Sequence, residues 1–182
     1  MPQRPSAAGN MPNGDVVRHP VEEDHPRLQV ALTDWWGGLG GETGAMQRCL
    51  LVPRLFLQHF SDTSFVVESD DGALRAFLVG FTSQSEPETA YIHFAGVCPQ
   101  RRRTGLGSRL YRDFFELARG HGRSRVRCIT GPVNLDSVAY HTKMGFRMEP
   151  GDRTGGDGDV PSKADYDGPG LDRVCFVREL SP

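Results

Sequence analysis

The stretch Cys98–Arg109, with the sequence CPQRRRTGLGSR, places three consecutive arginines and two glycines just before an apolar helical pattern. Gly105 and Gly107 let backbone N–H groups come close to a ligand, where a side chain would block the approach. The stretch follows a predicted strand and opens a predicted helix, so unpaired N–H groups and the positive end of the helix dipole point to one place. It therefore predicts a binding site for an anion.

The composition limits which anion this is. The chain has 182 residues and a formal net charge of −2, so it has the size of one domain and no overall positive field to attract a nucleic acid. Its four cysteines lie far apart without the spacing of a zinc site, which predicts free thiols, no metal and a cytoplasmic protein. Residues 1–13 are polar and lack the apolar core of a signal peptide.

Hydrophobic periodicity predicts a mixed α/β sheet covered by helices. The predicted helices are residues 25–36, 47–60 with a break at Pro53, 105–119 and 135–144, and Asp24 just before His25-Pro26 is the predicted cap of the first helix. The predicted strands are 16–17, 63–68, 73–81, 90–97, 125–130 and 173–178. Three further segments have the composition of loops or tails: we expect a disordered tail over 1–14, a mobile glycine loop over 37–41 and a long Gly/Asp-rich loop over 152–170.

Two known phosphate-binding loops do not fit the glycines. The chain has no GxxxxGK[ST] pattern, which excludes a P-loop. Leu110 occupies the position of the third glycine in the dinucleotide-binding fingerprint, and the loop comes too late in the chain for a first strand–helix turn. Taken alone, the stretch is also compatible with a solvated basic turn.

A second motif, NLDSVAYHTKMGF at Asn134–Phe146, follows one strand later. The pattern R-x-x-G-x-G from Arg102, together with N-x-x-S-x-x-x-H-x-x-x-G-F from Asn134, resembles the GNAT acyltransferase superfamily. The resemblance covers residues 15–180, including the order of elements. It implies a single acetyltransferase domain over 15–182, with a central mixed, mostly antiparallel α/β sheet that is splayed between two strands and flanked by helices.

The resemblance implies transfer of an acetyl group from acetyl-CoA directly to an amine, with the CoA between the strand before the loop and the next strand. The backbone of Ala95 and Val97 would pair with the pantetheine arm. Backbone N–H groups of the loop would hold the diphosphate, and two residues of the second motif would contact the pantetheine end; these residues are Arg102, Arg103, Thr104, Gly105, Leu106, Gly107, Ser108, Asn134 and Ser137. Two alternatives stay open, because Asn134 also suits a helix N-cap, and Arg101 or Arg103 could reach the 3′-phosphate or stay in solvent.

Four residues are candidates for proton transfer. His93 lies four residues before Val97, whose N–H the resemblance implies as the oxyanion donor, and relatives that acetylate aralkylamines carry working histidines there and at the position of Tyr91. Histidine titrates near the required pH, so His93 is the predicted base. His141 stands where the family usually has an acidic tyrosine, and Tyr140 precedes it. A core position remains the alternative for both histidines.

The predicted acceptor site comprises Asp34, Trp35 and Trp36 beside the glycine loop, where tryptophans suggest a partly apolar pocket that can close. A packing role for one tryptophan remains open. The aspartates of the late loop (Asp157, Asp159, Asp165 and Asp167) could attract a cationic amine or simply be solvated.

The main prediction is therefore an acetyl-CoA-dependent N-acetyltransferase for a small-molecule amine, without a membrane partner and with a homodimer left open. One alternative keeps the fold but takes the acyl group from aminoacyl-tRNA, with the arginines contacting phosphates. Another is a non-catalytic acyl-CoA sensor.

Overall fold

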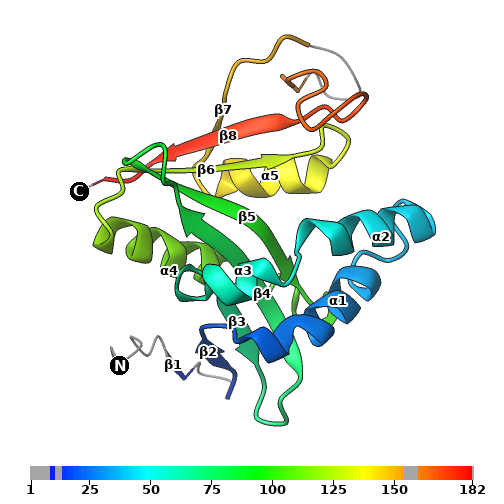
Figure 1. Ribbon diagram of the computed structural model, residues 1–182, viewed down its shortest axis with the longest axis vertical. Helices are drawn as coiled ribbons and strands as arrows, with labels where there is room; N and C mark the ends of the chain where they lie inside the picture. The colour runs from blue at the N-terminus through cyan, green and yellow to red at the C-terminus, as the bar shows by residue number, and fades with distance from the viewer. Residues whose placement is uncertain (1–8, 11–13, 154–159, 182) are drawn as a thin grey trace. The chain divides into compact units, whose positions relative to one another are not determined.

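Strand β5 (Thr89–Val97) and helix α4 (Leu106–Gly120) each contribute to two structural units of the chain (Figure 1). The computed structural model describes residues 9–10, 14–153 and 160–181. The first unit consists of Met1–Phe81 and Ile92–Phe114, and the second consists of Thr82–Tyr91 and Phe115–Pro182. Each unit is described by itself below.

The first unit holds one end of the sheet, in the order β1-β2-β3-β4-β5. The antiparallel strands β1 to β4 are Gly9–Asn10, Val16–Arg18, Phe65–Glu68 and Leu74–Thr82. The helices are α1 (His25–Asp34), α2 (Gly41–Leu51) and α3 (Leu55–His59), with 3-10 turns at Glu22–Asp24, Ser61–Thr63 and Pro99–Arg101. Residues 1–8 and 11–13 of the expected tail lie outside the described residues, whereas Gly9–Asn10 pairs with β2.

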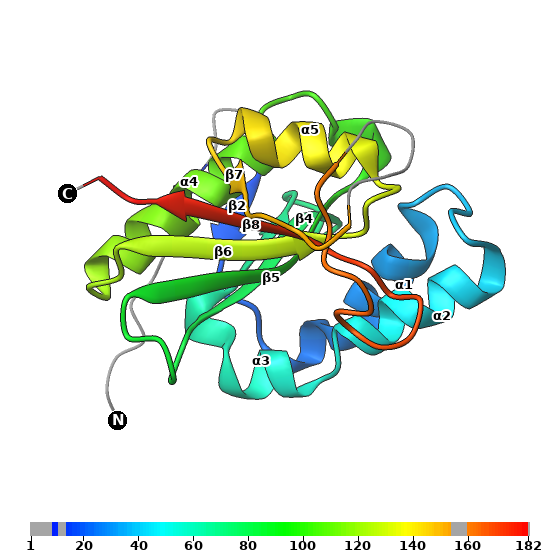
Figure 2. The ribbon, with the colours of Figure 1, turned by 90° about the horizontal axis from the view of Figure 1, so that it is seen from above.

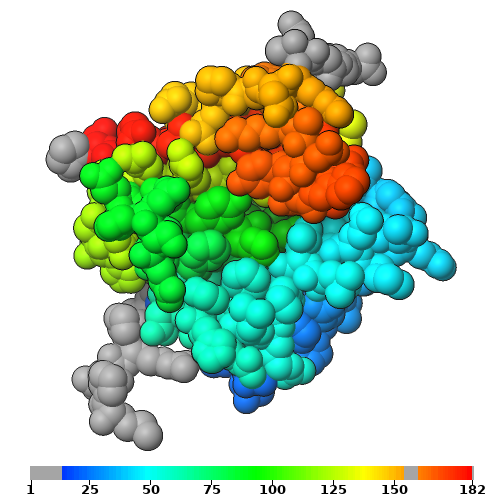
Figure 3. Space-filling model, turned by 45° about the horizontal axis from the view of Figure 1, so that its top comes forward, coloured from blue at the N-terminus to red at the C-terminus, as the bar shows by residue number. Residues whose placement is uncertain are grey.

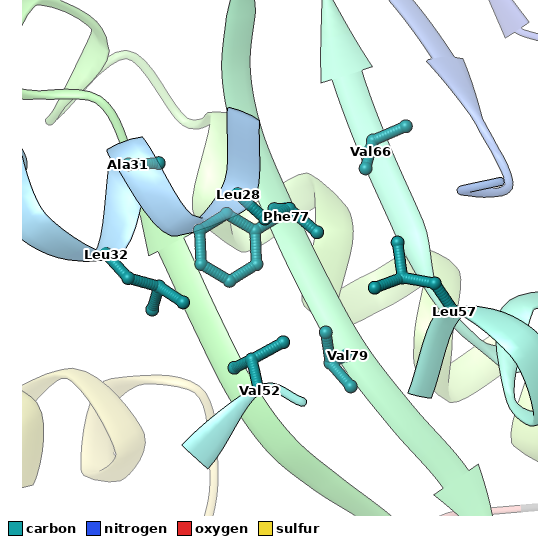
Figure 4. Packing of buried hydrophobic residues seen from close by; sticks show 8 residues of the cluster. All are labelled: Leu28, Ala31, Leu32, Val52, Leu57, Val66, Phe77 and Val79. Atoms are coloured by element: carbon teal, nitrogen blue, oxygen red, sulfur yellow. The ribbon is translucent and has the colours of Figure 1, made fainter. Parts of the chain in front are cut away.

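The core of the first unit forms where α1 packs on β3 and β4 (Figure 4). Leu28, Ala31 and Leu32 follow the i, i+3, i+4 spacing of one helix face and are almost fully buried. They belong to one cluster with Val52, Leu57, Val66, Phe77 and Val79. Burial of this stripe holds α1 on the sheet and so fixes the position of the tryptophans that follow it.

The second unit has the strand order β5-β6-β8-β7. The first three residues of β5 pair in parallel with β6 (Arg125–Thr130), from Thr89 opposite Arg125 to Tyr91 opposite Arg127. Strand β8 (Val174–Glu179) runs antiparallel to β6 and to β7 (Arg147–Met148). Helix α5 (Leu135–Lys143) runs along the β6–β8 pair (Figure 2).

Gly145 and Phe146, which end the second motif, have a packing role in this unit. Gly145 has a φ of +82°, and a Cβ there would collide with the guanidinium of Arg178. That guanidinium donates to the carbonyl of Met144 and lies 4.7 Å from the ring centre of Phe115. Phe146 packs against Phe115 with ring centres 5.8 Å apart. The left-handed backbone favours glycine at position 145, and any side chain there would also displace the Arg178 guanidinium from the Met144 carbonyl and Phe115.

The mixed, mostly antiparallel α/β fold predicted from the sequence is confirmed, with differences in detail besides strand β1. Pro53 does separate two helices, but the first begins at Gly41, inside the expected glycine loop. Strand β7 was missed because its two residues are exposed and carry no alternation. Asp24 makes no side-chain cap to α1. Within the described residues, the helices are too short or too polar to cross a membrane.

Asp24 is buried and serves instead as the centre of a charge cluster with Arg18, Arg27 and Glu68. Arg18 lies 2.8 Å and Arg27 2.5 Å from its carboxylate, and both arginines also reach Glu68, at 2.9 and 2.7 Å. Burial by itself raises the pKa of Asp24, but hydrogen bonds from Arg18 and from the N–H of Val21, with the charges of both arginines, bring the pKa below its usual value. This cluster ties β2, α1 and β3 together.

Replacement of Asp24 by Asn should lower the free energy of unfolding by about 1.5–3 kcal/mol, because it removes the charge-assisted hydrogen bonds of a buried carboxylate, while Arg18 and Arg27 keep Glu68 as a partner. Since the folded-state pKa is below the unfolded one, the stabilisation is present above about pH 4 and is lost as the pH falls through the folded pKa. Urea unfolding at pH 7 and at lower pH measures both effects. The control Glu22→Gln breaks an exposed pair with Arg54 and should change stability by less than about 1 kcal/mol; an equally small effect at Asp24 would contradict the cluster's role.

Candidate active site

The loop before α4 presents a row of backbone donors in the first unit. Arg103 and Gly105 have φ values of +61° and +89°, and α4 begins at Leu106. In the described parts of the chain, none of the N–H groups of residues 103–108 donates to a backbone or side-chain acceptor; the first helical bond runs from Arg109 N to Gly105 O, at 3.0 Å. Successive N–H groups around left-handed residues at a helix N-terminus form an anion-binding concavity. The loop therefore has the backbone geometry of a phosphate-binding site.

The three arginines of the loop have different roles. Arg101 pairs with the buried carboxylate of Asp15. Arg102 donates from Nε to the carbonyl of Val97 at 3.3 Å, and from Nη2 to the carbonyl of Trp35. Arg103 is exposed. Arg101 and Arg102 therefore bind groups of the protein itself, although Arg102 is exposed to solvent like Arg103.

Trp35 and Trp36 pack on the core of the first unit at the end of α1. The ring of Trp35 lies 5.7 Å from that of Phe77, and the ring of Trp36 lies 5.5 Å from that of Phe94. A Cβ on Gly96 would come within 2.8 Å of Trp36, so glycine in β5 is what lets this ring lie close to the strand. Both tryptophans are half-buried, which leaves part of each surface for a ligand, and Asp34 is exposed.

His93 projects from β5 into contact with the α2–α3 region. Its Nε2 lies 2.5 Å from the carbonyl of Leu51, and its ring stacks on Phe56 with centres 4.4 Å apart. A carbonyl only accepts, so Nε2 carries the proton and Nδ1 carries the lone pair in the neutral ring. This tautomer suits a base that works through Nδ1. Ala95 and Val97, further along the same strand, are half-buried.

In the second unit, the second motif forms a capped helix with a buried histidine. Asn134 is the N-cap of α5, and its Oδ1 accepts from the N–H of Ser137 at 3.2 Å, as the N-cap alternative predicted. His141 is buried, stacks on Phe176 at 4.9 Å, and donates from Nδ1 to the carbonyl of Ser137 at 2.7 Å. Burial lowers the pKa of His141, although the bond to Ser137 opposes this. The ring is therefore neutral near pH 7.

The two predicted site tyrosines, Tyr91 and Tyr140, are half-buried. The Tyr140 hydroxyl oxygen is buried, and its ring meets that of His141 edge-on at 6.0 Å. Burial, followed by nearby tyrosine, thiol and carboxylate groups, raises the pKa of Tyr91 far above its usual value. A phenol of that kind stays protonated, so Tyr91 can donate a hydrogen bond but is a weak proton donor and cannot act as a base at neutral pH.

The described aspartates of the late loop mainly build the loop itself. Asp165, which has a φ of +52°, accepts from the N–H of Gly170 at 2.6 Å, while Asp172 accepts from the N–H of Asp165 at 2.9 Å. Asp167 pairs with Arg173 at 2.7 Å. The other two predicted aspartates, 157 and 159, lie outside the described residues. Among the residues that are described, no group of three or more His, Cys, Asp or Glu side chains could hold a metal ion.

The predicted site residues thus form one group in each unit. The first unit holds the anion loop, Val97, His93 and the tryptophans, with Arg102 joining the loop to Trp35; the second holds Asn134, Ser137, Tyr140, His141 and Tyr91. The sequence analysis did not identify Asp15, which pairs with Arg101, because no motif includes the segment around Asp15. It also missed Arg48, a buried arginine in α2.

The sequence matches the acetyltransferase (GNAT) family over residues 27–146. It is 26% identical over 93 residues to the L-2,4-diaminobutyric acid acetyltransferase of Nocardia farcinica; this match covers 51% of the chain and 48%, about half, of that relative. Two solved structures share the fold. One is a GNAT-family protein of Desulfovibrio desulfuricans (16% identity, TM-score 0.66, 92% of this chain and 99% of that one). The other is the diaminobutyrate acetyltransferase EctA of Paenibacillus lautus, with its substrate and coenzyme A (21% identity, TM-score 0.62, 94% and 96%).

Replacement of Gly105 by Ala should weaken coenzyme A binding about 5- to 30-fold. No atom lies within 4 Å of the added Cβ, so the effect comes from the left-handed backbone, which costs a side chain about 1–2 kcal/mol. Calorimetric titration with coenzyme A measures it. Gly120→Ala is the matched control, since its φ is outside the left-handed region and its added Cβ also meets no atom. Equal affinity of the two variants would show that the loop conformation does not matter for binding.

His141 should make the unfolding free energy depend on pH below neutrality. Its folded pKa is lowered, so the unfolded chain binds a proton that the folded chain does not, and stability falls as the pH drops from about 6.5 towards the folded pKa. The slope contributed is at most about 1.4 kcal/mol per pH unit. Denaturant unfolding from pH 5 to 8 should show this slope in the wild type and in His121→Gln, an exposed control, but not in His141→Gln. An unchanged slope in His141→Gln would exclude the buried neutral histidine.

Proposed function

Because the chain belongs to the GNAT acetyltransferase family, we propose that it transfers an acetyl group from acetyl-CoA directly to the amine of a small molecule. The observation that carries this proposal is the row of N–H groups at residues 103–108, which have no acceptor in the described chain and suit a diphosphate. The likeness to a diaminobutyrate acetyltransferase supports a small amine as acceptor.

The reaction requires two proton movements. The amine must lose the proton of its ammonium form before its nitrogen attacks the thioester carbonyl carbon; the C–N bond then forms, the C–S bond breaks, and the departing thiolate takes up a proton. We assign the first movement to Nδ1 of His93, directly or through a water molecule. The hydrogen bond from Nε2 to Leu51 supports this, since it fixes the tautomer and orients the ring.

For the second movement, the features of His141 favour a packing role. Its Nδ1 proton is held by the carbonyl of Ser137, and its lowered pKa disfavours the imidazolium form. We therefore retain Tyr140, next to it in the motif, as the proton donor. The remaining cofactor-binding residues keep their predicted roles in the proposal: backbone groups of Ala95 and Val97 for the pantetheine arm, and the Asn134 amide for its far end.

The tRNA alternative loses the feature that suggested it. Arg101 and Arg102 are engaged within the protein, and four of the arginines that follow pair with acidic neighbours: Arg109 with Asp113, Arg119 with Glu116, Arg125 with Glu88 and Arg127 with Glu149. We therefore propose acetyl-CoA as the acyl donor. The four cysteines are free thiols, which supports the cytoplasmic location that we also propose.

The purified protein should release free thiol from acetyl-CoA in the presence of a small amine, and His93→Ala should lower kcat by about 10²- to 10⁴-fold, the usual contribution of a general base. A panel of diamines, amino acids, arylalkylamines and aminoglycosides identifies the acceptor. His59→Ala removes an exposed histidine of the same unit and serves as the control.

Three results would each contradict a different part of the proposal. Coenzyme A binding without thiol release from any amine would favour the sensor alternative. Activity that requires RNA and is lost with nuclease would favour the tRNA donor. A His93→Ala variant as active as His59→Ala would remove His93 as the base.

A further inference from the structure

Arg48, in α2, is the only buried arginine among the described residues, with 9% of its surface exposed. Its Nε donates to the carbonyl of Leu32 at 2.9 Å, near the end of α1, and its Nη1 donates to the carbonyl of Leu39 at 2.7 Å, in the glycine loop. The guanidinium carbon lies 5.7 Å from the ring centre of Trp36. Arg48 therefore sits beside the tryptophan that the sequence assigned to the acceptor site.

The charge of Arg48 lacks the compensation that other buried charges have. Asp24 is buried against Arg18 and Arg27, and Asp15 is buried against Arg101. Arg48, by contrast, forms no ion pair within the described residues, and its Nη2 is buried there without a hydrogen-bond acceptor. A buried cation of this kind is costly unless an anion pairs with it. Neither the two carbonyls nor the tryptophan ring supplies that negative charge.

The loop beside Arg48, residues 37–41, is exposed and consists of four glycines and one leucine. Gly37, Gly38, Gly40 and Gly41 all have positive φ values, and Leu39 between them is 59% exposed. Short backbone turns hold the loop, from Leu39 N to Trp36 O and from Gly41 N to Gly38 O. An added Cβ on Gly37, Gly38 or Gly41 would meet no atom within 4 Å, whereas one on Gly40 would lie 3.0 Å from the Cα of Gly44, so the loop has open space at three of its four glycines. The adjoining helix α2 lies at the surface (Figure 3).

A small displacement of Leu39 would create a specific anion site. It would free Nη1 from the Leu39 carbonyl, so that Nη1 and the unsatisfied Nη2 form the two parallel donors of a guanidinium fork. Nε would keep its bond to Leu32 and hold the fork in place, and Trp36 would support it from the side. A planar fork of this kind matches a carboxylate.

We propose that Arg48 binds a carboxylate of the acceptor, so that the acceptor is an amine that also carries a carboxylate. This inference rests on the proposed acetyl transfer and specifies its substrate class. Binding exchanges the Leu39 carbonyl for the carboxylate at Nη1 and supplies the missing acceptor at Nη2. The buried cation is thereby neutralised only when the correct acceptor is present.

Matched pairs of acceptors that differ by one carboxylate test the inference. They are L-2,4-diaminobutyrate with 1,3-diaminopropane, ornithine with putrescine, and lysine with cadaverine. For at least one pair, the wild type should acetylate the amino acid with a kcat/KM about 10- to 100-fold above that of the diamine, the range expected for hydrogen bonds to a charged group. In Arg48→Met, which keeps the apolar stem, this ratio should fall towards 1. Arg48→Lys, which keeps the charge but not the fork, should give an intermediate ratio.

Arg112→Met is the matched control, because it removes an exposed arginine of the same unit and should retain the wild-type ratio. A wild type without preference in any pair, or an Arg48→Met variant that keeps the preference, would overturn the inference. Circular dichroism shows whether Arg48→Met folds. If it does not, the acceptor preference of Arg48→Lys is compared with that of the wild type.

Binding measured without turnover separates this inference from the proposed function. In a thermal unfolding assay, the preferred amino acid should raise the Tm of the wild type more than its diamine does, and Arg48→Met or Arg48→Lys should lose that difference. If no amine is acetylated but the difference is present, the proposed function fails and the carboxylate site stands. If acetylation occurs with equal efficiency on both members of every pair, the carboxylate site fails and the proposed function stands.

Discussion

The consecutive backbone N–H groups of residues 103–108 are the constraint on which the rest of the candidate site depends. A row of donors without acceptors is tolerated where an anion or water satisfies it, and here two left-handed residues and a helix N-terminus hold the row in place. Because the backbone provides the donors, the side chains of the loop are not needed to bind the anion. Arg101 instead pairs with Asp15, and Arg102 donates to the carbonyls of Val97 and Trp35.

Arginine side chains join segments of the first unit that backbone pairing does not connect. Arg102 and Arg48 each donate to a carbonyl near the end of α1, so the tryptophans there are held both from the anion loop and from α2. Arg18 and Arg27 connect the start of α1 to β2 and β3 through Asp24 and Glu68. Arg27 and Arg48 each retain a buried donor without an acceptor in the described chain, but Arg27 pairs with the carboxylates of Asp24 and Glu68, whereas Arg48 forms no ion pair within the described residues. That contrast, rather than its sequence position, marks Arg48 as a candidate for ligand contact.

Individual site residues show how far sequence reasoning reached. The N-cap role of Asn134 follows from residue type and position alone, because a capping bond is local. For His141 the same kind of reasoning left acid and core roles open, since the stacking partner Phe176 lies on a strand that is distant in sequence. The tautomer of His93 depends on a carbonyl of α2 that no pattern in β5 reveals. Asp24 was expected to cap α1, but two arginines from different segments compete for its carboxylate more strongly than the helix N–H groups do.

The sequence by itself determined the family, the order of helices and strands, and the loop whose glycines admit an anion, because periodicity, turn chemistry and backbone freedom are local properties of the chain. It also determined that Gly145 and Phe146 belong to one motif. Only the tertiary structure decided why they do, since the reason is the guanidinium of Arg178 on another strand. The contacts of Arg101–Arg103 and of Arg48 were likewise decided only by the tertiary structure. Whether a charged side chain faces a ligand, a solvent shell or a buried partner is set by long-range packing, which a linear pattern does not encode.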